Sequence, residues 1–269
     1  MKKINFNDNW TFYNRKGIPK TVNLPHDAML EEKRDPNSPG GSAVGFFPPG
    51  EYIYEKTFIA PEDWIGKFIA IQFEGIYKDS RISINGNEAG GCRYGYIPFS
   101  IEATCFLKYG QENTIRVEVD NKDMPNSRWY TGAGIYRPVW MWVGEKKHIK
   151  IDGIKISTLS YNPARIYIEI DSTGGEAYVD IAYKGKKTAS ASGNKIEIEI
   201  PDAKLWSAET PELYECHVTL KDETGIVDEA RENFGIRKVE WSNKGLFING
   251  KETLLRGGCI HHDNGILGA

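Results

Sequence analysis

Apolar and polar residues alternate along most of the chain, and helical periodicity is nearly absent. Successive side chains of a strand point to opposite faces, so alternation predicts half-buried strands. Residues 195–200, Lys-Ile-Glu-Ile-Glu-Ile, alternate without a break. The pattern predicts strands over residues 52–59, 68–73, 81–84, 94–99, 113–119, 137–143, 149–157, 164–170, 177–183, 195–200, 214–220 and 229–234. We therefore expect an all-β chain.

Turn residues divide these strands. Asn85-Gly86 and Asn249-Gly250 are the dipeptide that most readily takes the two positive φ angles of a type I′ hairpin. Residues 31–50 carry several prolines and glycines, which predicts a long loop. Residues 9–13 and 22–27 are predicted to be irregular.

The strand spacing suggests three parts. We expect a first β-sandwich over residues 1–145. Residues 146–239 hold at least six short strands in under about 100 residues, which is typical of an immunoglobulin-like sandwich. Residues 240–269 begin as a hairpin and run into a cluster of glycines and histidines, which predicts the start of a third part.

Composition excludes several classes of partner. The 34 basic and 37 acidic residues are well mixed and give a net charge of −3, so no basic field favours nucleic acid or an anionic membrane. No apolar run approaches the roughly 18–20 residues of a membrane span. The N-terminus is polar from the second residue, so we expect no signal peptide. A cytoplasmic protein, or a mature secreted or periplasmic form, fits this pattern.

The four cysteines are Cys92, Cys105, Cys216 and Cys259, and no pair has CxxC spacing. They are predicted to be free and mostly buried thiols. No Cys/His pattern suggests zinc, so we expect neither a metal site nor a cofactor.

Four blocks of sequence carry a resemblance: residues 24–27 (Leu-Pro-His-Asp), 73–99, 127–137 (Ser-Arg-Trp-Tyr-Thr-Gly-Ala-Gly-Ile-Tyr-Arg) and 205–257. In order and spacing they resemble glycoside hydrolase family 2, the family of β-galactosidases, β-glucuronidases and β-mannosidases. The resemblance implies a jelly-roll, galactose-binding-like sandwich over 1–145, an immunoglobulin-like sandwich over 146–239, and a TIM barrel that begins in 240–269. A barrel needs around 250 residues, and 28 follow Trp241. We therefore expect the barrel to be truncated after its first strand.

The resemblance also implies a retaining mechanism with two carboxylates ~5–5.5 Å apart. In this family both come from later barrel strands, and the acid is preceded by Asn. Glu112-Asn113 and Glu232-Asn233 have the opposite order and fall in predicted sandwich strands. We therefore assign no catalytic residue and expect the chain to be inactive by itself.

Substrate-binding residues can still be predicted. The run from Arg256 to His261 is similar to the family's Arg-Gly-x-x-x-His pattern at the end of the first barrel strand, which implies that His261 lies near the substrate hydroxyls. His262 and Asp263 would orient it, as carboxylates commonly orient imidazoles. Alternatively, one of the histidines simply packs. Arg128 stands where some members carry an acid that binds sugar or a metal ion, and this departure argues against a metal. An ion pair at the surface or between domains is the alternative role for Arg128.

The leading hypothesis is the front part of a β-glycosidase, with β-galactosidase as the first expectation, that supplies substrate-binding loops and scaffold. A β-glucuronidase or β-mannosidase of the same family is an alternative. A stand-alone carbohydrate-binding module acting through aromatic loops such as 46–47 and 129–130 is another, and a purely structural pair of sandwiches is the third. The expected partner is a carbohydrate. The resemblance also allows a homo-oligomer, because the family often forms dimers or tetramers.

Overall fold

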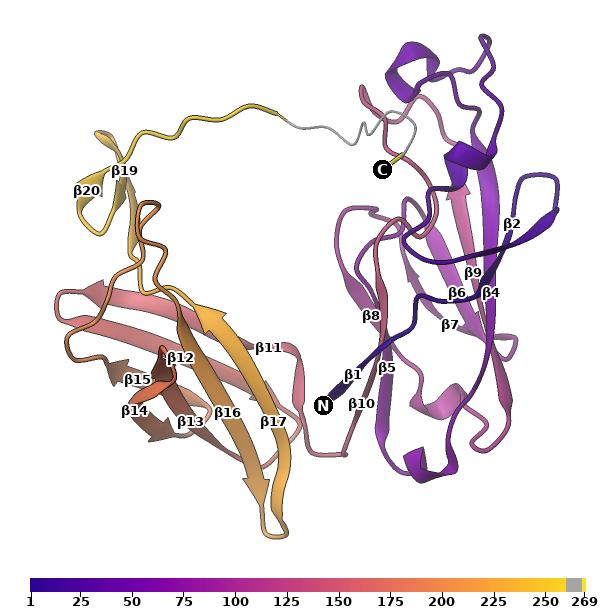
Figure 1. The fold of residues 1–269 in the computed structure, drawn as a ribbon. Coiled ribbons are helices and arrows are strands. Elements are labelled where there is room, and N and C mark those ends of the chain that lie inside the picture. The colour runs from indigo at the N-terminus through magenta and orange to yellow at the C-terminus, as the bar shows by residue number, and fades with distance from the viewer. Residues whose placement is uncertain (260–267) are drawn as a thin grey trace. The chain divides into compact units, whose positions relative to one another are not determined.

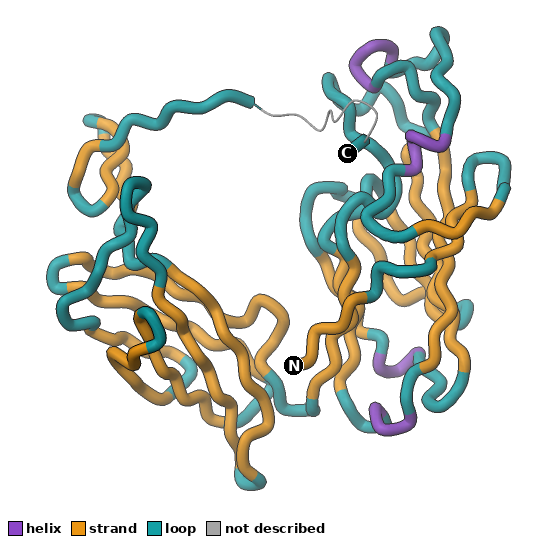
Figure 2. Tube along the Cα trace, viewed as in Figure 1, coloured by secondary structure: helices purple, strands orange, loops and turns teal. Residues whose placement is uncertain are grey.

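A computed structural model describes residues 1–259 and 268–269, which divide into two compact units (Figure 1). The first sandwich comprises Lys2–Val143 and the described part of residues 258–269. The second sandwich comprises Met1 and Gly144–Gly257. Strands dominate both (Figure 2), and the described helices are short 3-10 turns: η1 (Ala28–Glu31), η2 (Gly41–Val44), η3 (Glu62–Trp64) and η4 (Thr104–Phe106). No helix among the described residues has the length and apolar character to cross a membrane.

The first sandwich contains a six-stranded and a four-stranded sheet that share one core. The six-stranded sheet has the order β3 (Pro19–Val22), β2 (Trp10–Tyr13), β4 (Gly50–Ile59), β9 (Glu112–Asn121), β6 (Ser80–Ile84) and β7 (Asn87–Cys92). The four-stranded sheet has the order β1 (Lys2–Asn5), β10 (Val139–Gly144), β5 (Phe68–Phe73) and β8 (Phe99–Glu102). Alternation along β9 buries Ile115, Val117 and Val119 and leaves Arg116 and Glu118 on the outer face.

The second sandwich has the seven strands expected of an immunoglobulin-like fold. Its three-stranded sheet has the order β11 (Ile149–Tyr161), β12 (Ala164–Ser172) and β15 (Lys195–Glu199). Its four-stranded sheet has the order β14 (Lys186–Ser192), β13 (Glu176–Tyr183), β16 (Tyr214–Asp222) and β17 (Gly225–Phe234). Ile166 and Ile168 of one sheet and Val179 and Val218 of the other are fully or almost fully buried in the same core. The all-β sandwich prediction is confirmed.

A small third sheet follows, formed by β18 (Val239–Ser242), β19 (Gly245–Ile248) and β20 (Lys251–Glu252). Residues 253–259 form no strand, although the sequence predicts the first barrel strand here. An isolated strand leaves its backbone N–H and C=O groups without partners, and the exposed side chains of Leu254 and Leu255 find no core.

Both Asn-Gly turns are confirmed. Asn85 and Gly86 have φ angles of 51° and 80°, and Asn249 and Gly250 have φ angles of 50° and 75°. A type I′ turn needs two positive φ angles, which asparagine and glycine tolerate best.

Two local expectations are wrong, and the strand β14 is not among the predicted strands. Trp10–Tyr13 is the buried strand β2 rather than an irregular segment, because it pairs with β4. Residues 94–98 lie in a loop, and only Phe99 of that predicted strand belongs to β8. The strand β14 is an edge strand formed by pairing with β13, and its sequence, Lys-Lys-Thr-Ala-Ser-Ala-Ser, lacks an apolar stripe.

The cysteines are free, as expected, but they are not mostly buried. Cys216 is buried, Cys92 is half-buried, and Cys105 and Cys259 are exposed. Burial raises the pKa of the Cys216 thiol to about 12, so this thiol stays protonated at neutral pH.

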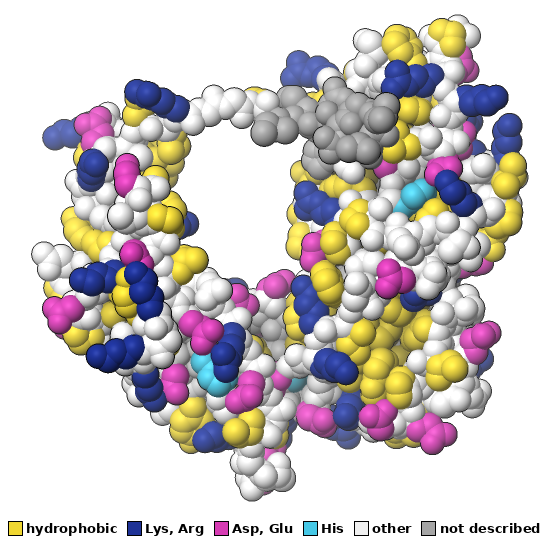
Figure 3. All heavy atoms as spheres, viewed as in Figure 1, with side chains coloured by type: hydrophobic (Ala, Val, Ile, Leu, Met, Phe, Trp, Pro, Cys, Tyr) yellow, Lys and Arg dark blue, Asp and Glu magenta, His cyan; other side chains and the backbone are white. Residues whose placement is uncertain are grey.

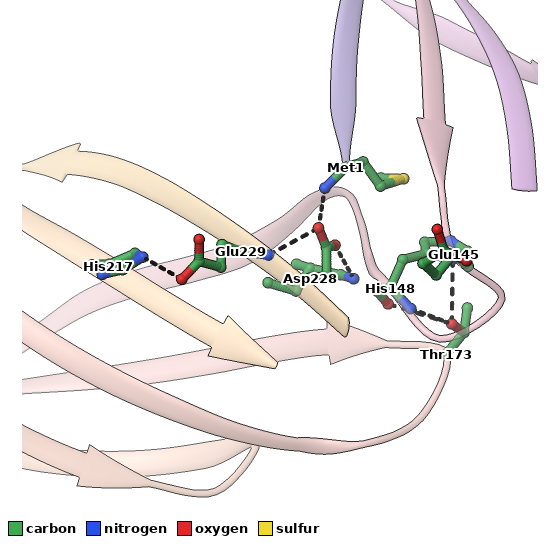
Figure 4. Close-up of polar contacts among 8 residues, drawn as sticks. Met1, Glu145, His148, Thr173, His217, Asp228 and Glu229 are labelled. Atoms are coloured by element: carbon green, nitrogen blue, oxygen red, sulfur yellow. Dashed lines mark hydrogen bonds and ion pairs between the residues drawn. The ribbon is translucent and has the colours of Figure 1, made fainter. Parts of the chain in front are cut away.

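A polar network joins the first strands of the second sandwich to β17 (Figure 4). The Asp228 carboxylate accepts hydrogen bonds from the backbone N–H groups of Ile149 and Glu229, at 2.8 and 2.9 Å, and pairs with the Met1 ammonium. Nearby, His148 Nδ1 lies 2.8 Å from the carbonyl oxygen of Glu145. Elsewhere acidic and basic side chains are interspersed over the face drawn in Figure 3, in line with the balanced charge of the chain.

Candidate functional site

Three segments that are far apart in sequence meet in the loops of the first sandwich. The backbone N–H of His26 donates to the carbonyl of Ile135 at 2.9 Å, and the N–H of Ala28 donates to the carbonyl of Ala133 at 2.8 Å. Tyr77 and Gly134 exchange two further backbone hydrogen bonds, at 2.8 and 3.0 Å. Residues 94–96 join them, because the Tyr136 hydroxyl donates to the Gly95 carbonyl at 2.7 Å. We call residues 24–28, 75–77, 94–96 and 126–137 the loop cluster.

A buried carboxylate holds the loop cluster together. Asp27 is 6% exposed. Its Oδ1 accepts the backbone N–H groups of Met29 and Ala133, at 3.0 and 3.1 Å. Its Oδ2 accepts the Tyr130 hydroxyl at 2.6 Å and the N–H of Ala269 at 2.9 Å. With four donors around it, Asp27 is a structural acceptor rather than a base for chemistry. Burial and this carboxylate raise the pKa of Tyr130, which remains a neutral donor.

The neighbouring histidine is also committed to the core. His26 Nδ1 lies 2.8 Å from the Tyr54 hydroxyl, and its ring packs 4.7 Å from that of Phe12. His26 Nε2 lies 3.6 Å from Glu31 Oε1, beyond hydrogen-bond distance. Burial lowers the pKa of His26, although Glu31 and Asp27 act in the opposite direction.

This shift predicts a pH dependence. The unfolded chain takes up a proton at His26 near pH ~6.5, whereas the folded chain resists protonation. The stability that the neutral ring contributes is therefore present above about pH 6.5 and is lost as pH falls through the lower folded pKa. We expect the free energy of unfolding of the first sandwich, measured in urea, to fall between pH 7 and pH 5. The fall should be smaller in His26→Asn, and an identical pH slope in the two proteins would contradict this assignment.

Aromatic rings line the other side of the loop cluster. Tyr96 packs edge-on against Tyr94 at 5.6 Å and against Tyr77 at 5.3 Å, and its hydroxyl accepts the indole N–H of Trp129 at 3.2 Å. Tyr94 is 59% exposed. Burial raises the pKa of Tyr77 to about 12, so its hydroxyl is a neutral partner for Asn126 Oδ1 at 3.4 Å. Exposed rings fixed by their neighbours can stack on the apolar face of a pyranose.

Comparison with known proteins places these features in a family. Residues 145–237 match the model of glycosyl hydrolases family 2. A putative β-glucuronidase of Formosa agariphila is 32% identical over 99% of this chain and 28% of its own length. A β-galactosidase of Bacteroides ovatus is 30% identical over 100% of this chain and 35% of its own. The chain belongs to glycosyl hydrolase family 2.

A solved structure supports the same assignment. The crystal structure of a β-glycosidase from Bacteroides vulgatus matches this family 2 chain with a TM-score of 0.89 at 31% identity. The match covers 100% of this chain and 38% of that protein. The chain therefore spans well under half the length of the relatives it matches, between 28% and 38% for these three.

Of the three predicted substrate-binding residues, the structure describes Arg128. Arg128 lies in the loop cluster with an exposed side chain, directly before Trp129. Its loop is shaped by Ser127, whose hydroxyl donates to the Trp129 carbonyl at 2.5 Å and accepts the Trp129 N–H at 3.1 Å. His261 and His262 lie outside the described residues, so their substrate-binding roles stay predictions.

Two further observations concern the chemistry of this family 2 chain. Among the described residues, no group of three or more His, Cys, Asp or Glu side chains could hold a metal ion. The sequence also contains one dipeptide with the Asn-Glu order, Asn87-Glu88, in addition to the two Glu-Asn pairs considered above. Both residues are exposed and begin the edge strand β7, directly after the Asn85-Gly86 turn. Their place on an exposed hairpin gives no enclosed site for a general acid.

The sequence does not indicate that Asp27 and Tyr130 form a connected pair. Asp27 lies in a segment predicted to be irregular, and Tyr130 lies in an aromatic loop 103 positions away. Only the fold brings the carboxylate and the phenol together. The glycines between Tyr130 and Ile135 are the available signal, because Gly132 and Gly134 adopt positive φ angles of 65° and 94° beside them.

Proposed function

We propose that this chain supplies substrate-facing loops and the β-sandwich scaffold of a retaining β-glycosidase, with β-galactosidase as the first candidate activity. The observation that carries the proposal is the loop cluster, in which exposed Tyr94 and Arg128 accompany Trp129 and Tyr96 in a family 2 chain. The relatives' names support a β-glycosidase of this family and include both β-galactosidases and β-glucuronidases.

The chain's own contribution is binding rather than bond cleavage. Retaining hydrolysis needs an acid and a nucleophilic carboxylate ~5–5.5 Å apart. Asp27, the buried carboxylate of the loop cluster, is already surrounded by donors. The exposed rings would stack on the sugar and Arg128 would hydrogen-bond to it. We propose that His261 contacts the sugar hydroxyls and that His262 orients it.

A β-glucuronidase is the second candidate, and Arg128 favours it. A guanidinium offers a planar pair of N–H donors that matches a carboxylate, and glucuronic acid differs from galactose by carrying one. An exposed arginine at the loop cluster is therefore a suitable partner for a uronic acid. It can also donate to the hydroxyls of a neutral sugar, so the substrate test must include both.

The test is hydrolysis of the nitrophenyl β-galactoside, β-glucuronide and β-mannoside by the full-length gene product and by residues 1–269 alone. We expect the full-length protein to cleave the galactoside best. We expect residues 1–269 to cleave none above the buffer rate, because we assign neither of the two catalytic carboxylates to them. Preference for the glucuronide would replace the first candidate by the second. Turnover by residues 1–269 that persists across independent preparations, or no cleavage by the full-length protein, would overturn the proposal.

A further inference from the structure

The outer face of the six-stranded sheet carries a groove that is distinct from the loop cluster. Two depressions of about 300 and 430 Å³ adjoin on this face and share Glu51 and Ile53 of β4 as lining residues. The first extends over β9 and β6, and the second over β2 and the turn that follows it. We call the joined depressions the sheet groove. Their sizes fall in the range of small-molecule sites.

One row of side chains crosses the sheet groove from strand to strand. Tyr13 of β2 pairs with Ile53 of β4, Ile53 pairs with Glu118 of β9, and Glu118 pairs with Arg81 of β6. Cross-strand partners point to the same face, and neighbouring strands are about 4.8 Å apart, so the row spans roughly 14 Å. Its first half presents a phenol ring and an aliphatic side chain, and its second half presents a carboxylate and a guanidinium.

A second row fixes the polar groups in place. Arg116 donates through Nη1 to Glu55 Oε1 at 2.6 Å and through Nε to Glu118 Oε1 at 3.0 Å. The Tyr13 hydroxyl donates to Glu55 Oε2 at 3.0 Å. These contacts hold the Tyr13 ring and the Glu118 carboxylate in defined positions before any ligand arrives, which reduces the entropy lost on binding. By contrast, the exposed Arg81 guanidinium has no ion pair within 4.0 Å among the described residues.

The charges of the sheet groove point to a neutral ligand. Its lining includes five carboxylates and four cationic side chains, namely Glu51, Glu55, Asp79, Glu118 and Asp120 against Arg15, Arg81, Arg116 and Lys122. The carboxylates exceed the cationic groups by one, so this lining gives neither an anion nor a cation a strong net attraction. A sugar hydroxyl can donate to a carboxylate and accept from a guanidinium at once, and the apolar face of a pyranose fits against Tyr13 and Ile53.

We propose that the sheet groove is a second carbohydrate site, which binds a neutral β-linked oligosaccharide of about three units along the row from Tyr13 to Arg81. A trisaccharide matches the roughly 14 Å length of the row. The site is open and shallow, so a dissociation constant of about 1 mM is expected. This inference does not rest on the proposed hydrolytic function, because no residue of the loop cluster lines the sheet groove.

The test is titration of the 269-residue chain with β-1,4-galactotriose, cellotriose and β-1,4-mannotriose. Binding is measured by calorimetry and by the chemical shifts of backbone amides. At least one should bind and shift amides of β2, β4, β6 and β9. The double variant R81A/E118A, whose side chains are both exposed, should weaken binding about tenfold or more through lost charge-assisted hydrogen bonds. The matched control R165A/E197A removes an exposed Arg–Glu pair from the second sandwich and should bind as the original chain does.

Trp129→Ala, in the loop cluster, separates this inference from the proposed function. It should leave trisaccharide binding unchanged. No binding by any of the three sugars, equal binding by R81A/E118A and the original chain, or loss of binding in Trp129→Ala would each overturn the second site. If R81A/E118A melts at a lower temperature, Arg81→Gln alone is used, and it should weaken binding several-fold. The hydrolysis assay of the full-length protein decides the proposed function independently of all these outcomes.

Discussion

Replacing Asp27 by alanine is expected to lower the free energy of unfolding of the first sandwich by about 3 kcal/mol. The substitution leaves the backbone N–H groups of Met29 and Ala133 and the hydroxyl of Tyr130 buried without their acceptor. Each unsatisfied buried donor costs about 1–3 kcal/mol, and these three cannot all reach water without opening the loops. Urea unfolding of the 269-residue chain, followed through the transition of the first sandwich, measures the effect.

Asp27→Asn is the control for this prediction. The amide oxygen of asparagine can still accept the backbone N–H groups of Met29 and Ala133. Its NH₂ group, however, replaces the Oδ2 atom that accepts the Tyr130 hydroxyl and the Ala269 N–H. We expect a loss of roughly half that of alanine. If Asp27→Ala and Asp27→Asn both unfold at the urea concentration of the original chain, the carboxylate does not hold the loops together.

Gly134→Ala is expected to cost a similar amount, about 3 kcal/mol, for a steric reason. Gly134 has a φ of +94°, and a Cβ there would lie 2.1 Å from the Tyr54 hydroxyl oxygen and 3.2 Å from the Ala28 Cβ. Tyr54 is fully buried and bonded to His26, so it cannot move aside cheaply. We also expect the two backbone hydrogen bonds between Gly134 and Tyr77 to weaken. Thermal and urea unfolding of the variant test this.

Gly86→Ala separates the two parts of that cost. Gly86 also has a positive φ, +80°, but no atom lies within 4 Å of the position its Cβ would take. Its substitution should therefore cost only the conformational part, about 1 kcal/mol. Equal destabilisation by the two substitutions would mean that the contact with Tyr54 contributes nothing.

Local pattern was sufficient wherever one residue's neighbours in sequence decide its conformation. The Asn85-Gly86 and Asn249-Gly250 turns follow from the φ angles that these residues tolerate. The strand β5 (Phe68–Phe73) has the predicted bounds, because a run that is apolar except for Gln72 is buried on both faces of a central strand. Pattern failed for β2, because its partner β4 is remote in sequence. It also failed for β14, which forms a hairpin with the neighbouring β13 but lacks an apolar stripe.

The loop cluster shows the same division at the candidate site. Its segments could be recognised one by one, most of them by their glycines and aromatic residues, and Arg128 could be named as a candidate binding residue from its place in a motif. The sequence did not predict that Asp27 would accept hydrogen bonds from four donors. Nor did it predict that Tyr94, Tyr96 and Trp129 would contact one another. Apart from the local contacts of Asp27 with Met29 and of Tyr94 with Tyr96, these contacts join residues 33 to 242 positions apart.

The sequence by itself determined an all-β chain of two sandwiches, the positions of its tight turns and its resemblance to family 2, because alternation, turn chemistry and motif order are local properties. Only the tertiary structure decided which polar residues form hydrogen bonds inside the fold and which are exposed and available to bind a ligand. Asp27 is buried, His26 is half-buried, and both are hydrogen-bonded, whereas Arg81 and Arg128 are exposed. Burial depends on contacts between strands that the chain brings together only when it folds, and the same is true of the row of side chains across the sheet groove.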